Sequence, residues 1–190
     1  MLLLVGLGNP GSNYTNTRHN IGFKIIDAIN AHFKLSKQKP KFKGLLTTGN
    51  IDEKKIYAIK PLTFMNNSGT AIKELIDYFK IDAKNVFVFH DDMDIDFGKI
   101  KAKFGGSSAG HNGIESIDKF IGKDYSRVRI GIGHPKQKKK VNNHVLEDFK
   151  EDEEEKINDI TENIVKQLPT LIEKKIDLFS SKVNQDLNGI

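Results

Sequence analysis

The sequence contains no cysteine and no tryptophan, and only five of its residues are proline. The absence of cysteine excludes disulfide bonds, thiol nucleophiles and cysteine-ligated metal sites, and it fits a cytoplasmic protein. No run of about 18 apolar residues occurs, so we expect no membrane-spanning helix. The apolar start at 1–5 lacks the basic region of a signal peptide and runs directly into a turn-rich segment, so we do not expect a signal peptide.

A chain of 190 residues has the length of one domain with a single hydrophobic core. We therefore predict one domain over 1–190, with a frayed tail after about residue 180. The net charge of +5 is compatible with a polyanionic partner. Lysines at 99, 101 and 103 alternate, so in a strand they share one face, whereas the segment 147–155 is acidic.

Short apolar runs alternate with helical patterns along the chain, which is typical of an α/β fold with a mixed, twisted sheet flanked by helices. The expected strands are 2–7, 45–51, 55–59, 86–89, 100–104 and 128–132. The expected helices are 17–32, 67–79, 112–120 and a charged helix from about 152 to 166 that resumes after Pro169. In such a sheet, the ligand site is expected at the carboxyl ends of the parallel strands.

The first glycines match a dinucleotide-binding pattern, since Gly6, Gly8 and Gly11 have the spacing GxGxxG. The pattern needs a helix that begins within the glycines, so that its N-terminus faces a pyrophosphate. Here Pro10 and a polar run delay the expected helix to about Thr17. A tight turn between strand and helix explains these glycines, and nucleotide binding is not favoured.

Polar segments follow the expected strands at four places, 9–20, 60–69, 90–94 and 105–113. Histidine is the natural base near neutral pH, and His19 lies in the first segment. A carboxylate such as Asp91 would fix its tautomer and stabilise the imidazolium. Asparagine NH₂ groups, from Asn9, Asn66 and Asn112, can bind a carbonyl or its oxyanion. Together these groups suit hydrolysis of an acyl bond by activated water, without a covalent nucleophile.

A serine nucleophile is one alternative that the sequence leaves open. Residues 106–110 match the GxSxG elbow between a strand and a helix, with Ser108 as the nucleophile. A triad of this kind needs a histidine farther along the chain. The two available, His134 and His144, lie beside a proline and in a polar loop. The serine mechanism is therefore the second choice among enzymatic mechanisms.

A divalent cation is the other open alternative. Asp91, Asp92 and Asp94 together with His19 or His111 offer ligands of the kind that Mg²⁺ or Mn²⁺ accepts. The spacing neither excludes nor supports such a site, because no HxH or HExxH motif occurs in the chain.

Seven short motifs occur in order from Leu4 to about Pro135. They are VGLGNPG at 5–11, tyrosine at 14, TRHNxG at 17–22, KPxTFMNxSG at 60–69, HDDxD at 90–94, GHNG at 110–113 and RVRIGIGHP at 127–135. Each motif alone is weak, but in this order they resemble the bacterial peptidyl-tRNA hydrolase family. The resemblance implies cleavage of the ester between a peptide and the 3′-terminal ribose of tRNA, in the cytoplasm, by a monomer that needs no metal or organic cofactor.

The same resemblance implies roles for individual residues. His19 would be the general base for the attacking water and Asp91 would orient it, with Asn9 and Asn66 near the scissile carbonyl. Lys103 and Arg129 would clamp the 5′-phosphate of tRNA, which excludes initiator tRNA. The basic run 136–140 is a further candidate for a tRNA contact because of its charge, without support from the family pattern. The other expected substrate contacts are Tyr14 near the tRNA 3′ end, Asn20, Met65 and Asn112 along the peptide crevice, and His111 in support.

Overall fold

The computed structural model describes residues 1–135 and 141–187, so the basic run 136–140 lies outside the described residues. The strands are β1 (Leu2–Gly6), β2 (Lys39–Lys41), β3 (Gly44–Ile51), β4 (Lys54–Pro61), β5 (Val86–Asp92), β6 (Ile100–Phe104) and β7 (Ser126–Gly131). The α-helices are α1 (Ile21–His32), α2 (Ser68–Phe79), α3 (Asn112–Ile121), α4 (Val141–His144), α5 (Glu151–Ile172) and α6 (Ile176–Leu187). None of the helices in these two stretches is long and apolar enough to cross a membrane.

The seven strands of the described residues belong to one mixed sheet in the order β2-β3-β4-β1-β5-β7-β6. Strand β1 pairs in parallel with β4 and β5, and β5 pairs in parallel with β7. The β3–β4 hairpin and the edge strand β6 supply the antiparallel part. The predicted α/β fold with a mixed sheet is therefore confirmed, and the strands predicted at 45–51 and 55–59 form a hairpin that closes at residues 52–53.

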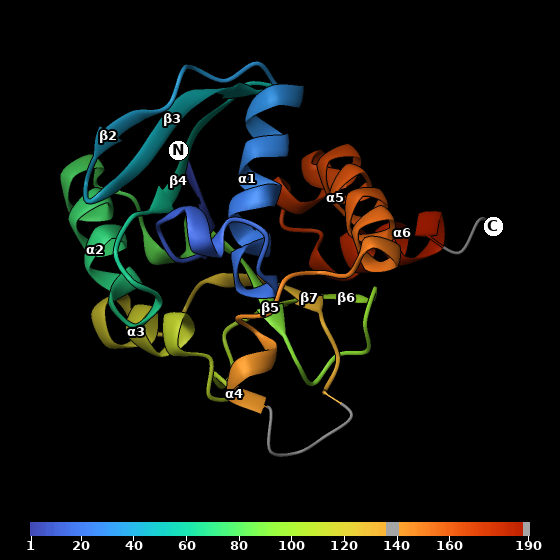
Figure 1. Ribbon diagram of the computed structural model, residues 1–190. Helices are drawn as coiled ribbons and strands as arrows, with labels where there is room; N and C mark the ends of the chain where they lie inside the picture. Colours follow the sequence, from blue (N-terminus) through green and yellow to red (C-terminus); the bar gives the residue numbers. More distant parts are fainter. Residues whose placement is uncertain (136–140, 188–190) are drawn as a thin grey trace.

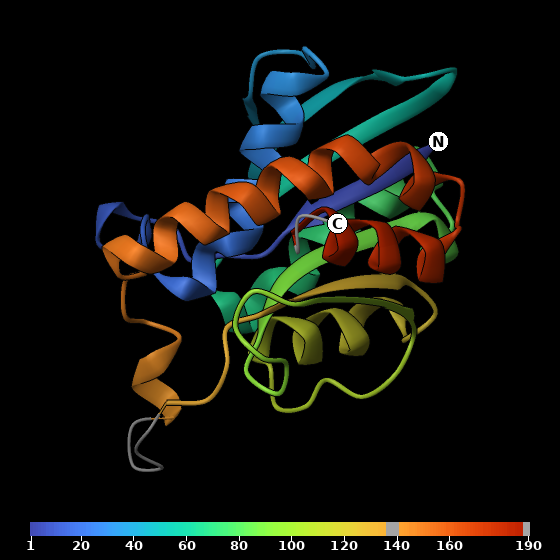
Figure 2. The ribbon, with the colours of Figure 1, turned by 90° about the vertical axis from the view of Figure 1, so that its right-hand side faces the viewer.

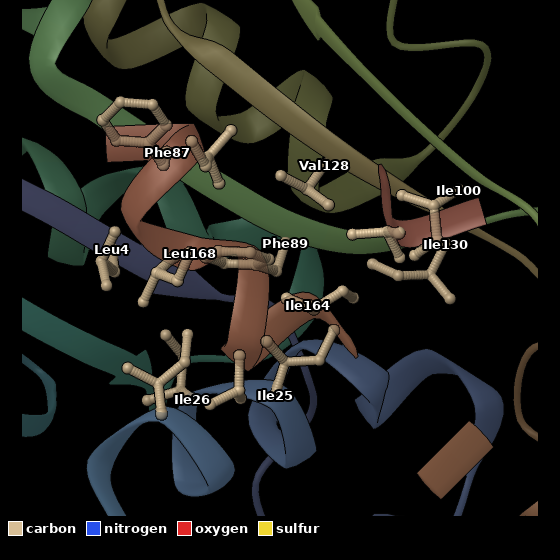
Figure 3. Close-up of a cluster of buried hydrophobic side chains, with 14 of the residues drawn as sticks. Leu4, Ile25, Ile26, Phe87, Phe89, Ile100, Val128, Ile130, Ile164 and Leu168 are labelled. Atoms are coloured by element: carbon tan, nitrogen blue, oxygen red, sulfur yellow. The ribbon is translucent and has the colours of Figure 1, made fainter. Parts of the chain in front are cut away.

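Helices cover both faces of the sheet, so the central strands are apolar on both sides, as expected for parallel strands (Figure 1). Alternate residues of β1 face opposite ways: Leu4 packs with α1, α5 and α6, and Leu3 packs with α2 and α3. Figure 3 shows the first of these cores, where Phe87 and Phe89 of β5 meet Ile164 and Leu168 of α5.

The start of α1 lies unusually close to the sheet. A Cβ atom on Gly22 would lie 2.3 Å from the main-chain nitrogen of Leu7 and 2.4 Å from the carbonyl oxygen of Phe89. Glycine therefore allows α1 to begin directly against the ends of β1 and β5. Its first residue is Ile21, preceded by a single 3₁₀ turn at Arg18–Asn20, so the helix that we expected from residue 17 starts later.

Two expectations about the C-terminal part are wrong. Pro169 does not interrupt α5, because the apolar stripe continues across it from Ile164 to Leu168 and Leu171, which are all fully buried. Packing of that stripe on the sheet outweighs the loss of one helical hydrogen bond.

The tail is not frayed after residue 180 either, since α6 continues to Leu187 and buries Phe179 and Val183. The Asn184 side chain bonds the main-chain N–H and C=O of Ile100, which completes the edge strand β6. In Figure 2, α5 and α6 lie side by side across the sheet.

Candidate active site

A cavity of about 340 Å³ opens at the carboxyl ends of the parallel strands. The loops after β1, β4 and β5 and the glycine-rich loop before α3 meet there, as the strand order predicts. Of the residues predicted to form the site, those that line the cavity are Asn9, His19, Met65, Asn66, Asp91, His111 and Asn112.

His19 and Asp91 form the buried centre of this cavity. Nδ1 of His19 lies 2.9 Å from both carboxylate oxygens of Asp91, at the end of β5. Because a carboxylate accepts, Nδ1 carries the proton and donates it, and Nε2 keeps its lone pair. Burial alone would lower the pKa of His19, but the charge and hydrogen bond of Asp91 raise that pKa above its ordinary value.

A second imidazole bonds the same carboxylate. Nε2 of His111 lies 3.0 Å from Oδ1 of Asp91, while Nδ1 accepts the N–H groups of Gly113 and Ile114 and so caps α3. These two acceptor contacts fix the tautomer with the proton on Nε2. Burial favours the neutral acid, yet the two imidazoles hold the pKa of Asp91 far below its usual range.

The donor set does not fit a metal ion. One ligand atom from each of His19, Asp91 and His111 lies within 4.8 Å of the others. A metal on Nε2 of His111 would move the proton to Nδ1, where two N–H groups already point. The other aspartates diverge: Asp92 bonds Arg129 at 2.7 Å, and Asp94 bonds His134 at 2.9 Å. The aspartates therefore do not form the cation site that was left open.

The serine mechanism also lacks support. Ser108 lines the cavity, but its Oγ donates to Oε1 of Glu115 at 3.2 Å. Both ring nitrogens of His111 are engaged by Asp91 and by α3, and His134 pairs with Asp94. Nε2 of His144 lies 3.3 Å from the carbonyl of Ile132. Among the residues that the structure describes, no histidine hydrogen-bonds Ser108.

The asparagines have different tasks. Oδ1 of Asn9 accepts the Met65 N–H at 2.8 Å, which leaves its NH₂ group available to the cavity. Asn66 and Asn112 line the cavity with exposed side chains. Asn20, predicted to contact substrate, is instead buried, and its amide bonds the main-chain N–H and C=O of Asn9. Its contribution is to hold the loop that carries Asn9.

The predicted tRNA contacts lie outside the cavity. Tyr14 sits on the 3₁₀ turn Ser12–Tyr14. Lys103 and Arg129 share a separate hollow beside α6, where partial burial and the neighbouring arginine charges lower the pKa of Lys103. Nε of Arg129 donates to Asp92. Arg127 is buried and paired with Asp118, so it offers no charge to a partner.

Sequence reasoning missed one wall of the cavity. Val145 and Leu146, which follow α4, also line the cavity. They are more than 120 residues from His19 in the chain, and none of the seven motifs includes them. The contacts that hold this segment to Arg18 and His19 give them their place.

Fold and site are those of an α/β enzyme with a buried carboxylate–imidazole pair at the carboxyl edge of its sheet. The family model of peptidyl-tRNA hydrolases matches residues 3–189. A peptidyl-tRNA hydrolase of Pelagibacter ubique is 72% identical over 97% of this chain and 99% of the relative. One of Ehrlichia ruminantium is 47% identical, over 95% and 93% of the two chains.

Solved structures agree with these sequence relatives. The crystal structure of peptidyl-tRNA hydrolase from Acinetobacter baumannii matches with a TM-score of 0.90 at 34% identity, over 97% of this chain and 94% of that one. The chain therefore belongs to the peptidyl-tRNA hydrolase family.

The charge of Asp91 is open to a direct test. Asp91→Asn removes the charge that raises the pKa of His19 but leaves the burial that lowers it, so we expect the pKa of His19 to fall below its ordinary value of about 6.5. An NMR titration of the His19 ring measures it. Asp94→Asn is the control, because Asp94 pairs with His134 at the surface, and it should leave the midpoint of the His19 titration unchanged. An unchanged or raised midpoint in Asp91→Asn would show that the charge of Asp91 is not what raises the pKa of His19.

Proposed function

We propose that this protein hydrolyses the ester between the peptide and the 3′-terminal ribose of peptidyl-tRNA, with water activated by His19 and without a covalent nucleophile. Membership of the peptidyl-tRNA hydrolase family supports the substrate class. The observation that carries the mechanism is the buried His19–Asp91 pair, which leaves Nε2 of the imidazole as a free base beside the cavity.

His19 can act as a base because its hydrogen bond to Asp91 keeps the proton on Nδ1 and leaves Nε2 free to accept one. Nε2 of His19 takes a proton from water as the water attacks the ester carbonyl, and Asp91 stabilises the imidazolium that results. The proton then passes to the departing 3′ oxygen of the ribose. An alkoxide leaves more readily than an amide nitrogen, so the reaction does not need an acyl-enzyme intermediate.

Amide groups around the base stabilise the negative charge that develops on the carbonyl oxygen during the attack. The NH₂ group of Asn9, aimed by the Met65 N–H, and that of Asn66 donate to the carbonyl oxygen as it gains negative charge. Asn112 bonds the peptide backbone, and Met65 gives that crevice an apolar floor. His111 keeps Asp91 ionised and oriented through its fixed tautomer.

The tRNA body binds over the basic edge of the sheet. Lys103 and Arg129 hold a phosphate at the 5′ end, in the hollow beside α6, and Tyr14 lies near the 3′ end. Such recognition reads backbone, shape and ends rather than sequence, and it depends on salt. We propose further that the protein acts in the cytoplasm as a monomer and needs no cofactor.

His19→Ala tests the base. Without the imidazole, the attacking water has no acceptor for its proton, so we expect turnover of an N-blocked aminoacyl-tRNA to fall by about 10²–10⁴-fold. Filter binding should show tRNA affinity nearly unchanged. His32→Ala, an exposed histidine at the end of α1, is the control. Retained turnover in His19→Ala would refute the assignment. A wild-type protein that binds tRNA without cleaving it would be an RNA-binding protein on this fold.

Lys103→Ala tests the phosphate clamp. Loss of one phosphate contact should weaken tRNA binding and reduce the slope of log affinity against log salt by about 1. Titrations at several salt concentrations measure both quantities. Lys39→Ala removes a lysine from β2 at the opposite edge of the sheet and should leave the slope as it is. A slope that Lys103→Ala leaves unchanged would contradict the phosphate contact.

A further inference from the structure

Arg18 directly precedes His19, and its guanidinium is buried, with only 3% of the side chain exposed. A charge removed from water needs close partners. Within the described parts of the chain, the partners of the Arg18 guanidinium come from residues 144–153, more than 120 positions farther along the chain. Residues 144–149, which include Val145 and Leu146, are called the cover segment below.

The guanidinium reaches the cover segment and the helix behind it at once. Nη1 donates to the carbonyl of Glu147 at 3.2 Å and to that of His144 at 3.5 Å. Nη2 donates to Oε2 of Glu153 at 2.6 Å, and the Phe149 ring lies under the guanidinium, 5.5 Å away. Lysine, a point charge on a flexible stem, cannot make these contacts together.

Main-chain hydrogen bonds also join the cover segment to the turn that carries His19. The N–H of His19 donates to the carbonyl of Val145 at 2.8 Å, and the N–H of Arg18 donates to that of Glu147 at 3.1 Å. The N–H of Phe149 donates to Asn16 at 3.3 Å. The carbonyl of Glu147 therefore accepts both the main chain and the side chain of Arg18. What holds the cover segment in place also holds the backbone of His19.

Glu153 anchors this arrangement to the body of the fold. It lies in the first turn of α5, where its side chain also accepts the N–H of Lys150 at 2.9 Å. Helix α5 packs on the sheet through Ile157 and Ile160, both fully buried. The cover segment is thus fixed at α5 on one side and at the His19 turn on the other. Its Val145 and Leu146 form a wall of the cavity that contains His19.

We propose that Arg18 is a positioning residue for His19: its guanidinium clamps the cover segment to the His19 turn, which keeps the imidazole aligned on Asp91 and shielded from water. The proposal rests on the role of His19 in the proposed function. Arg18 itself does not line the cavity, and its guanidinium is engaged by the cover segment and Glu153, so we expect it to touch no reacting atom.

A purely structural ion pair would affect only the stability of the fold, so the readouts have to report on His19. The titratable groups that face its ring are Asp91 of β5 and His111 at the start of α3. If the clamp loosens, water weakens the influence of Asp91, and the pKa of His19 moves down from its raised value toward that of free imidazole. A small misplacement of the base also lowers kcat.

The experiment compares Arg18→Lys with the wild-type protein. We expect kcat per folded molecule to fall by about 10-fold to 10²-fold with KM nearly unchanged. NMR titration of the His19 ring should give a lower midpoint. Arg127→Lys is the matched control: Arg127 is equally buried, ion-paired with Asp118 and stacked on Tyr125, but it lies in β7 and its hydrogen bonds go to Ser107 and Asp118 instead of the cover segment. It should lower the melting temperature without moving the His19 midpoint.

A second variant, Glu153→Gln, keeps the proposal testable if Arg18→Lys does not fold. Glu153→Gln removes the charge that pairs with Arg18 but keeps an acceptor oxygen, and it should shift kcat and the midpoint in the same direction by less. Unchanged kcat and an unchanged midpoint in the folded Arg18→Lys protein, whatever its melting temperature, would overturn the positioning role. The midpoint is measured without substrate, so it tests the positioning role of Arg18 even if His19 is not the base. The base assignment is tested separately, because turnover retained in His19→Ala would refute it.

Discussion

The site depends on one carboxylate that stays ionised although it is buried. Asp91 ends the central strand β5, and without partners its burial would favour the neutral acid. Two imidazoles donate to it, one from the loop after β1 and one from the cap of α3. A carboxylate that is charged in this way raises the pKa of His19 and fixes its tautomer. The chemistry of the site follows from that single charge.

The fold supplies this arrangement through the geometry of its strands. Successive residues of β5 point to opposite faces, so Asp91 faces the two histidines while Asp92 pairs with Arg129. One strand end therefore contributes both to the cavity that contains His19 and, through Arg129, to the hollow beside α6. His90, one residue earlier, packs edge-on against His111, and burial keeps its pKa well below the ordinary value, so it adds no charge behind the site.

Local patterns in the sequence were enough to predict most of the fold. The two hairpin strands and β5 follow from short apolar runs, and α2 follows from apolar periodicity. The convergence of His19, Asp91 and the amides follows from the position of polar residues directly after strands. The end of the chain was mispredicted because α6 is stabilised by distant contacts of Phe179, Val183 and Asn184. The continuous α5 has the same cause, since tertiary packing overrides the local effect of Pro169.

Other features of the site depend on contacts that no local pattern encodes. That Asn20 holds Asn9 rather than substrate, and that Ser108 pairs with Glu115 rather than with a histidine, could be learned only from the assembled loops. The cover segment is the clearest case. None of the seven motifs of the sequence includes it, and it joins the site because Arg18 and the main chain of His19 bind it.

The most direct test of the central claim is peptide release from an N-blocked aminoacyl-tRNA, measured in EDTA and, in parallel, with a serine-reactive inhibitor. A water mechanism based on His19 and Asp91 predicts hydrolysis at an unchanged rate under both conditions. Loss of hydrolysis in EDTA would assign the chemistry to a metal held by the carboxylates. Loss with the inhibitor would assign it to a serine, and either loss would contradict the account.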